Sequence, residues 1–487
     1  MPKAKPNTLL FEINTILWFN QLREVYGADL TLSNVPYEEW LRLKKLGFDF
    51  VWLMGVWKRS RRSAEIASGI DALKAQYRFA LPDWQQEDVV GSPYAVQSYE
   101  VDPLLGNMDD LRLVKKILNE LEMGLILDYV PNHLALDHPW VFEHPEYFVQ
   151  ADTEEFGKEP SKYLEVDLES GTVYIAHGRD PYFPPWTDTV QLNIFNEEAK
   201  AALIKTLRSI SDYCDGVRCD VAMLLLNDVF QRTWGHLLKK GGWEAKEEFW
   251  SEAISEIKKA KPEFITIAEV YWGLEDRMLK LGFDYAYDKN LYDSLLNEQI
   301  ESVKRILSID QATQSRYVRF TENHDELRAV NAFGRERSMA ASLIAYTLPS
   351  MRLLHQGQIE GRKIRAPLQL KRIADEPVDS EIQKFYTTLL TALSSDALHY
   401  GKWALLGVEG AQTVFSWLWE LGMNRAFICV NYASREAVCS IKLGEQFMKD
   451  IFNARVSLRR GVYINEVDTE GYIKVRLEPY ALWLTLA

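Results

Sequence analysis

Cysteine is scarce in this sequence, with four residues among 487: Cys214, Cys219, Cys429 and Cys439. They form no Cys-x-x-Cys pair. Two of them lie in or beside apolar strand candidates, as buried thiols of a reducing compartment do. The N-terminus, MPKAKPNTLLFEINTILWF, has no apolar stretch followed by a small-residue cleavage site. These features predict a cytoplasmic protein.

Long apolar runs and an excess of positive charge are also missing. No run approaches the roughly 18 residues of a membrane span, so a membrane partner is not expected. The net charge of −14 disfavours nucleic acid, because binding a phosphate backbone requires a basic surface. A neutral substrate fits this charge better. Aromatic residues make up 12% of the chain, and their rings can stack on sugars as well as pack in a core.

Short apolar runs alternate with segments of helical period over most of the chain. Three amphipathic helices are predicted within 36–47, 107–124 and 196–214. Strands alternating with helices are typical of βα units around a parallel sheet. Eight such strands predict an α/β fold of the (β/α)8 TIM-barrel type, with strands at 9–14, 50–56, 125–130, 216–221, 264–270, 283–288, 317–323 and 351–357.

Two stretches interrupt this alternation, at 57–107 after the second strand and at 134–190 after the third. The second is rich in Pro, His, Asp and aromatic residues and is predicted to be a small inserted domain, since long structureless loops are uncommon. Beyond residue 398, short alternating strands predict a separate all-β domain. The predicted organisation is a barrel from 1–133 and 191–397, an inserted domain at 134–190, and a C-terminal β-sandwich at 398–487.

Three acidic residues end separate predicted strands: Asp220 in GVRCD, Glu269 in FITIAE and Asp325 in FTENHD. Because the carboxyl ends of barrel strands converge on one face, these side chains are expected to share one pocket. A single strand-end Asp is more often a helix cap or a surface residue. Three of them in equivalent contexts instead predict acid, base and nucleophile roles.

Four segments occur in an order and strand context that resemble the α-amylase family of retaining α-glycosidases: DYVPNH (128–133), GVRCD (216–220), AEV (268–270) and ENHD (322–325). A fifth, SPYAVQSYEVDPLLG (92–106), is similar to the family's segment after the second strand. The resemblance implies that Asp220 is the nucleophile, Glu269 the general acid/base and Asp325 the carboxylate that holds the sugar hydroxyls. It implies no cofactor for the chemistry.

The chemistry of acetal cleavage supports this division of roles. Two carboxyls about 5 to 5.5 Å apart give retention through a covalent intermediate. Arg218 lies two residues before Asp220, on the same strand face, and is expected to keep Asp220 ionised. Glu269 follows the apolar Ile265 and Ile267, so partial desolvation is expected to raise its pKa and keep a proton available.

The same resemblance implies further residues around the sugar. Tyr94 matches the aromatic platform under the ring, and His133 and His324 match hydrogen-bond donors, although each also suits a packing role. Asn132 matches a ligand of a structural calcium ion, for which the acidic residues of 134–190 show no identifying spacing. Four aromatic residues are candidates for additional sugar platforms, and each alone is more often a packing residue: Trp140, Tyr182, Trp186 and Trp272.

The sequence departs from the family pattern after the nucleophile. Many members carry Lys and His there, whereas this chain reads VAMLLLND from Val221 to Asp228. The leading hypothesis is hydrolysis of α-linked glucans or malto-oligosaccharides by double displacement. A transglycosylase or a small-disaccharide α-glucosidase would use the same three acids. A barrel that binds carbohydrate without catalysis is the alternative from another class.

Overall fold

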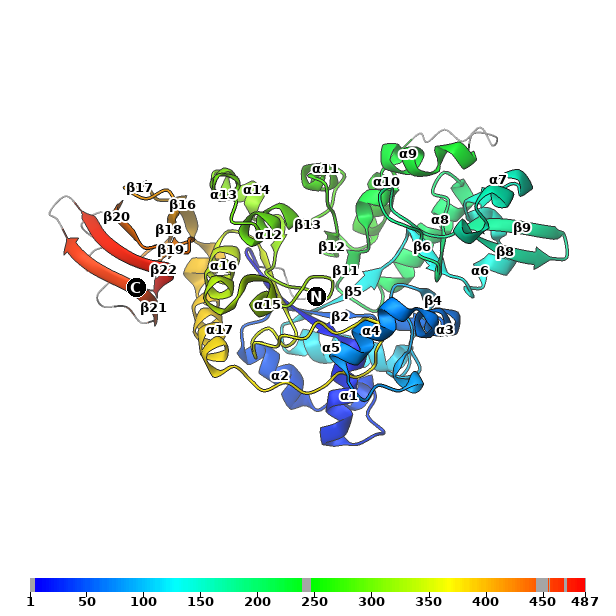
Figure 1. Cartoon of the computed structure of the whole chain (residues 1–487), viewed down its shortest axis with the longest axis horizontal. Coiled ribbons are helices and arrows are strands. Elements are labelled where there is room, and N and C mark those ends of the chain that lie inside the picture. The colour runs from blue at the N-terminus through cyan, green and yellow to red at the C-terminus, as the bar shows by residue number, and fades with distance from the viewer. Residues whose placement is uncertain (1–4, 239–246, 444–453, 455, 468–470, 487) are drawn as a thin grey trace.

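A computed structural model of the chain describes residues 5–238, 247–443, 454, 456–467 and 471–486. Eight parallel strands close into a barrel at its centre (Figure 1), which confirms the predicted (β/α)8 fold. Neighbouring barrel strands in the sequence pair with each other, and the first strand pairs with the last to close the barrel. In chain order they are β1 (Leu9–Asn14), β2 (Phe50–Met54), β5 (Gly124–Tyr129), β11 (Gly216–Cys219), β12 (Ile265–Ala268), β13 (Tyr285–Tyr287), β14 (Tyr317–Arg319) and β15 (Met351–His355).

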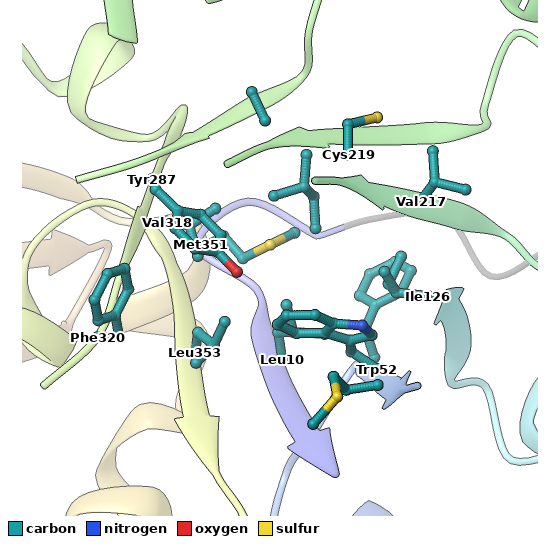
Figure 2. Packing of buried hydrophobic residues seen from close by; sticks show 14 of the residues in the cluster. Leu10, Trp52, Ile126, Val217, Cys219, Tyr287, Val318, Phe320, Met351 and Leu353 are labelled. Atoms are coloured by element: carbon teal, nitrogen blue, oxygen red, sulfur yellow. The ribbon is translucent and has the colours of Figure 1, made fainter. Parts of the chain in front are cut away.

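The barrel strands are apolar because both of their faces are covered. All six residues of β1 are buried, for example. Inside the barrel, Leu10 lies opposite Leu353, and Trp52 lies opposite Ile126. Figure 2 shows these side chains filling the interior. Several predicted strands continue beyond the observed ends, because hydrogen-bonded pairing stops where the chain turns into the loops above the barrel.

Helices cover the outside of the barrel. The three predicted amphipathic helices are α2 (Tyr37–Lys45), α5 (Met108–Glu120) and α8 (Glu197–Ile210). In the described part of the chain, no helix is both long and apolar enough to cross a bilayer. The other helices that follow barrel strands are α1 (Thr15–Tyr26), α9 (Asn227–Leu238), α10 (Phe249–Ala260), α11 (Glu275–Lys280), α12 (Lys289–Leu296), α13 (Ile300–Leu307), α14 (Gln311–Gln314), α15 (Ala329–Phe333), α16 (Arg335–Thr347), α17 (Ser380–Leu393) and α18 (Asp396–Tyr400).

The interruption after β2 is more regular than the sequence indicated. It contains two helices, α3 (Arg61–Gly69) and α4 (Asp71–Ala80), enclosed by the paired strands β3 (Trp57–Arg59) and β4 (Val96–Val101). Ser60 caps the N-terminus of α3, and its side chain accepts a hydrogen bond from the Ser63 amide. These helices escaped prediction because they are short and only partly buried.

The segment after β5 leaves and rejoins the barrel through two adjacent strands. Strands β6 (His133–Ala135) and β10 (Thr189–Gln191) are antiparallel, with His133 opposite Gln191. Between them the chain forms α6 (Trp140–Glu143), α7 (Thr153–Lys158) and a small sheet of β7 (Gln150–Ala151), β8 (Tyr163–Leu168) and β9 (Gly171–Ala176). Figure 1 shows this segment at the opposite end of the molecule from the C-terminal domain.

The C-terminal domain is all-β, as predicted. In the part of the chain that the structure describes, the strands predicted as a sandwich are linked through one hydrogen-bonded path. The long β22 joins its two halves: residues 482–486 pair with β19, and residues 472–477 pair with β20. The Trp419 indole donates to the Thr347 carbonyl at the end of α16, at 2.8 Å, and so ties the sheet to the barrel. The strands are β16 (Lys402–Leu405), β17 (Val408–Glu409), β18 (Val414–Leu421), β19 (Asn424–Asn431), β20 (Ala437–Lys442), β21 (Val456–Val467) and β22 (Tyr472–Leu486).

Candidate active site

The three predicted acids lie together at the C-terminal end of the barrel. Asp220 directly follows β11 and Glu269 directly follows β12, and these strands are neighbours with Cys219 opposite Ala268. Asp325 is carried in by the loop after β14. All three line one cavity of about 410 Å³. Convergence of parallel strand ends therefore places these side chains where the sequence predicted them.

Arg218 joins two of these acids. Its Nη1 lies 2.6 Å from Asp220 Oδ1, and its Nη2 lies 2.8 Å from Glu269 Oε2. Both nitrogens belong to one planar guanidinium group, so the two carboxylates are held close together on the same side of the pocket. The sequence predicted only the contact with Asp220. The contact with Glu269 depends on the register of β11 and β12.

Opposing effects act on the Asp220 carboxyl. Burial raises the pKa of Asp220, the charge of Arg218 lowers it, and the charge of Glu269 raises it again. Arg218 therefore offsets part of the cost of burying the ionised Asp220 carboxylate.

Two further contacts fix the Glu269 carboxylate. The Tyr271 hydroxyl donates to Glu269 Oε1 at 2.6 Å, and the Val221 amide donates to Glu269 Oε2. Val221 has a φ of +37°, a strained conformation for a β-branched residue at the turn after Asp220. Neither residue was predicted from the sequence as part of the site. For Tyr271 the available signal was its spacing of two from Glu269, which puts it on the same side of an extended chain.

The third acid, Asp325, is the first of three charged side chains that contact one another in a row, followed by His324 and Glu12. Asp325 Oδ2 lies 3.1 Å from His324 Nε2, and His324 Nδ1 contacts the buried Glu12 on β1. Burial raises the pKa of Asp325, but the charge and hydrogen bond of His324 outweigh it and lower that pKa to about 2. Burial lowers the pKa of His324, but Asp325 and Glu12 raise it well above its usual value. Asp325 is thus an anion and His324 a cation at neutral pH.

Tyr94 lies beside His324, the middle residue of this row of charged groups. Its hydroxyl is 2.8 Å from His324 Nε2, and its ring stacks on His324 with centroids 5.4 Å apart. The Arg218 guanidinium lies over the Tyr94 ring, 5.1 Å from its centroid. Tyr94 also lines the cavity, as the sequence predicted for a platform residue.

His133 approaches the cavity from β6. Burial lowers its pKa to about 4, so the ring is neutral at neutral pH. Its Nδ1 lies 3.2 Å from the Asn132 amide nitrogen, which can only donate, so the ring proton is assigned to Nε2. That nitrogen faces Asp220 Oδ2 at 3.9 Å, close enough for a sugar hydroxyl to contact both groups.

The surroundings of Asn132 do not fit the calcium ion that the resemblance implies. The Gln191 amide nitrogen donates to Asn132 Oδ1 at 3.1 Å and to the Asn132 carbonyl at 2.8 Å, so the oxygens a cation would need already have a donor. Calcium takes six to eight oxygen ligands. Within the described ranges, no group of three or more His, Cys, Asp or Glu side chains could hold a metal.

Chelation provides a direct check of this point. Because an amide pair joins Asn132 to Gln191 across β6 and β10, incubation with excess EDTA is expected to leave the melting temperature unchanged. Gln191→Ala is expected to lower the stability by about 1–3 kcal/mol, since it leaves buried partners without a donor. Scanning calorimetry measures both. A fall in melting temperature with EDTA that calcium alone reverses would contradict this assignment.

The fold and the site together define a (β/α)8-barrel protein with three carboxylates at the strand ends, of which Asp220 and Glu269 are buried. The family model for the α-amylase catalytic domain matches residues 39–364. The chain belongs to the α-amylase family, which confirms the resemblance seen in the sequence.

The individual proteins that this chain resembles have low sequence identity to it. The α-amylase MalA of Haloarcula japonica is 24% identical over 342 residues, covering 67% of this chain and 45% of that protein. An α-1,4-glucan:maltose-1-phosphate maltosyltransferase of Rhodospirillum rubrum is 25% identical over 326 residues, covering 65% and 40%. The chain thus spans less than half the length of these two relatives. The crystal structure of the maltogenic α-amylase AmyB from Thermotoga neapolitana shares the fold, with a TM-score of 0.64, 20% identity and 99% coverage of both chains.

Proposed function

We propose that this protein is a retaining glycoside hydrolase that cleaves α-glucosidic bonds in α-glucans or malto-oligosaccharides. The observation that carries the proposal is the single guanidinium of Arg218 that holds Asp220 and Glu269 in one cavity with Asp325. Two carboxyls at one reaction centre, with a third anion beside them, match the needs of double displacement at a sugar carbon.

In the first step, Glu269 donates its proton to the glycosidic oxygen as the bond from that oxygen to C1 breaks. Asp220 attacks C1 from the opposite face and forms a glycosyl ester. In the second step, Glu269 takes a proton from water, the water oxygen bonds to C1, and the ester bond to Asp220 breaks. Arg218 stabilises the carboxylate form of both acids in turn. Tyr271 keeps Glu269 oriented throughout.

The remaining residues bind the sugar ring beside C1. Asp325 accepts hydrogen bonds from ring hydroxyls, and its low pKa keeps it an acceptor over the neutral range. The Nε2–H of His133 acts as a donor to the sugar. His324, whose two ring nitrogens contact Glu12 and Asp325, holds the Asp325 carboxylate in place. Tyr94 supplies an apolar ring face below the sugar. A neutral glucan, rather than nucleic acid or a membrane, is the partner that this site suits. The four buried, unpaired cysteines support a cytoplasmic location.

Transfer to a sugar hydroxyl is the second candidate, because it uses the same intermediate and because one relative is named a maltosyltransferase. Incubation with maltose, malto-oligosaccharides, sucrose, trehalose and pullulan, followed by chromatography, tests both. Hydrolysis predicts shorter products only. Products longer than the substrate would favour transfer, and the absence of any cleavage would overturn the proposal.

A further inference from the structure

The first barrel strand carries an acid into the interior of the barrel. Glu12 on β1 is fully buried, and its backbone pairs with Trp52 on β2 and His355 on β15. Glu12 Oε1 contacts His324 Nδ1, whereas Glu12 Oε2 accepts no hydrogen bond within the part of the chain that the structure describes. An ionised carboxylate in such a place lowers stability unless a cation offsets its charge. A side chain that carries this cost is a candidate for a functional role.

His355, the paired neighbour of Glu12 on β15, does not supply that cation. Arg328 Nη1, which can only donate, lies 2.8 Å from His355 Nδ1, so this ring nitrogen accepts a hydrogen bond and carries no proton. The His355 ring is therefore neutral. Burial lowers the pKa of His355 and the charge of Arg328 lowers it further, in agreement with this assignment. The counter-ion of Glu12 is His324.

His324 faces a carboxylate oxygen at each of its ring nitrogens. Nδ1 contacts Glu12 Oε1, and Nε2 lies 3.1 Å from Asp325 Oδ2. An ionised carboxylate can only accept, and a neutral imidazole has one N–H, so only the imidazolium has a donor for both contacts. The ring lies between Trp52, with centroids 5.4 Å apart, and the stacked ring of Tyr94. The two aromatic rings therefore fix where His324 lies, while the two carboxylates decide its charge.

Glu12 reaches the substrate only through this histidine. Asp325 lines the catalytic cavity, and Glu12 is not among the residues that line it. With His324 as a cation, its Nε2–H donates to Asp325 Oδ2, and Asp325 Oδ1 remains for the sugar hydroxyls. Without the charge of Glu12, burial favours the neutral ring, and the Asp325 carboxylate loses a donor that carries a positive charge.

We propose that Glu12 is a positioning residue for the glycosidase reaction: it keeps His324 protonated at both nitrogens, and His324 in turn holds Asp325 ready for the sugar hydroxyls. The proposal rests on the proposed glycosidase function. It gives the first barrel strand a part in the reaction, although that strand carries none of the segments that resemble the family.

Other charged or titratable groups surround His324, and the test leaves them in place. Besides Glu12 and Asp325 they include Tyr94 ahead of β4, Asp128 on β5, Arg328 after β14, His355 on β15 and Arg362 in the loop after β15. When Glu12 alone is changed, a shift in the titration of His324 therefore traces to Glu12.

Glu12→Gln removes the charge and keeps the size of the side chain. Nitrogen NMR of protein labelled with ¹⁵N-histidine follows the protonation of His324, and His324→Asn assigns its signals. The wild-type ring is expected to stay a cation through neutral pH. In Glu12→Gln the midpoint of its titration should fall by about one to three pH units, the effect of one adjacent charge. The kcat/KM for maltotriose at pH 7 should fall about tenfold, because Asp325 loses a charge-assisted hydrogen bond.

Two further variants separate positioning from stability. Glu12→Asp keeps the charge and should restore the high midpoint and most of the maltotriose activity. Asp288→Asn is the matched control, because Asp288 is a buried acid directly after β13 that pairs with the buried Arg319 at 2.9 Å, outside the cavity lining. This control should lower the melting temperature, since Arg319 loses its partner, while the His324 titration and kcat/KM stay close to the wild-type values.

Three results would overturn the role of Glu12 and leave the hydrolase intact. The first, which needs no variant, is a wild-type His324 that titrates near its unperturbed value of about 6.5. The second is an unchanged midpoint in Glu12→Gln, and the third is an unchanged kcat/KM beside a lowered midpoint. Failure of the wild type to cleave maltotriose would overturn the hydrolase, and with it the part of Glu12 in the reaction.

Discussion

Asp220→Asn is expected to reduce turnover of malto-oligosaccharides by about 10⁴-fold or more, because the amide cannot form the glycosyl ester. Folding should survive the change. Burial raises the pKa of Asp220, so in the folded protein its ionised form is disfavoured relative to the unfolded chain, and this cost grows as the pH rises above the unfolded value. A neutral amide removes the cost. The melting temperature at pH 7 should equal or exceed that of the wild type.

A smaller replacement separates loss of the nucleophile from damage to the site. Asp220→Gly leaves space beside C1, and azide should occupy it and restore turnover of α-glucosyl fluoride, giving the β-glucosyl azide. The control is Asp228→Asn, eight residues along the chain, where a 65% exposed carboxylate pairs with Arg277. That variant should keep wild-type rates. Near-normal activity in Asp220→Asn would eliminate Asp220 as the nucleophile.

Glu269→Gln is expected to slow the cleavage of substrates whose leaving group must be protonated, and to affect much less those whose leaving group needs no proton. With maltotriose, kcat should fall by about 10² to 10⁴-fold, the usual contribution of a general acid. With α-glucosyl fluoride the formation of the glycosyl ester should be far less affected, since fluoride leaves without protonation. Stopped-flow release of fluoride measures this first step directly, before the slower attack of water that Glu269 also assists.

Glu275→Gln provides the matched control for Glu269→Gln. Glu275 is also a buried carboxyl near the end of β12, and burial raises its pKa to about 7, but its contact is with Asn290 and it does not line the cavity. This variant should retain activity on both substrates. Equal losses with maltotriose and the fluoride in Glu269→Gln would show that Glu269 acts in some way other than protonating the leaving oxygen.

Sequence alone located the parts of the site that depend on regular structure. A strand-end acid is visible as a polar residue after an apolar run, and a (β/α)8 barrel brings such ends together. The placements of Asp220, Glu269, Arg218 and Tyr94 follow from that rule and from the family motifs. The same periodicity gave the barrel strands and the C-terminal all-β domain.

Contacts between distant segments required the structure. Glu12 and His324 are 312 residues apart, and nothing in either motif indicates that they touch. A single buried acid in the strand LLFEIN was the only signal, since an unpaired carboxylate is costly in a barrel interior. The contact of Arg218 with both Asp220 and Glu269 likewise depends on the register of β11 and β12. The sequence indicated only the contact with Asp220.

The most direct measurement of the central claim is the anomeric configuration of the first product. Proton NMR of wild-type enzyme acting on maltotriose resolves the α and β anomers before they equilibrate. If Asp220 and Glu269 act as nucleophile and acid/base at one carbon, the reducing sugar released at C1 of the cleaved bond appears first as the α anomer. Initial formation of the β anomer would mean a single displacement by water and would contradict the account.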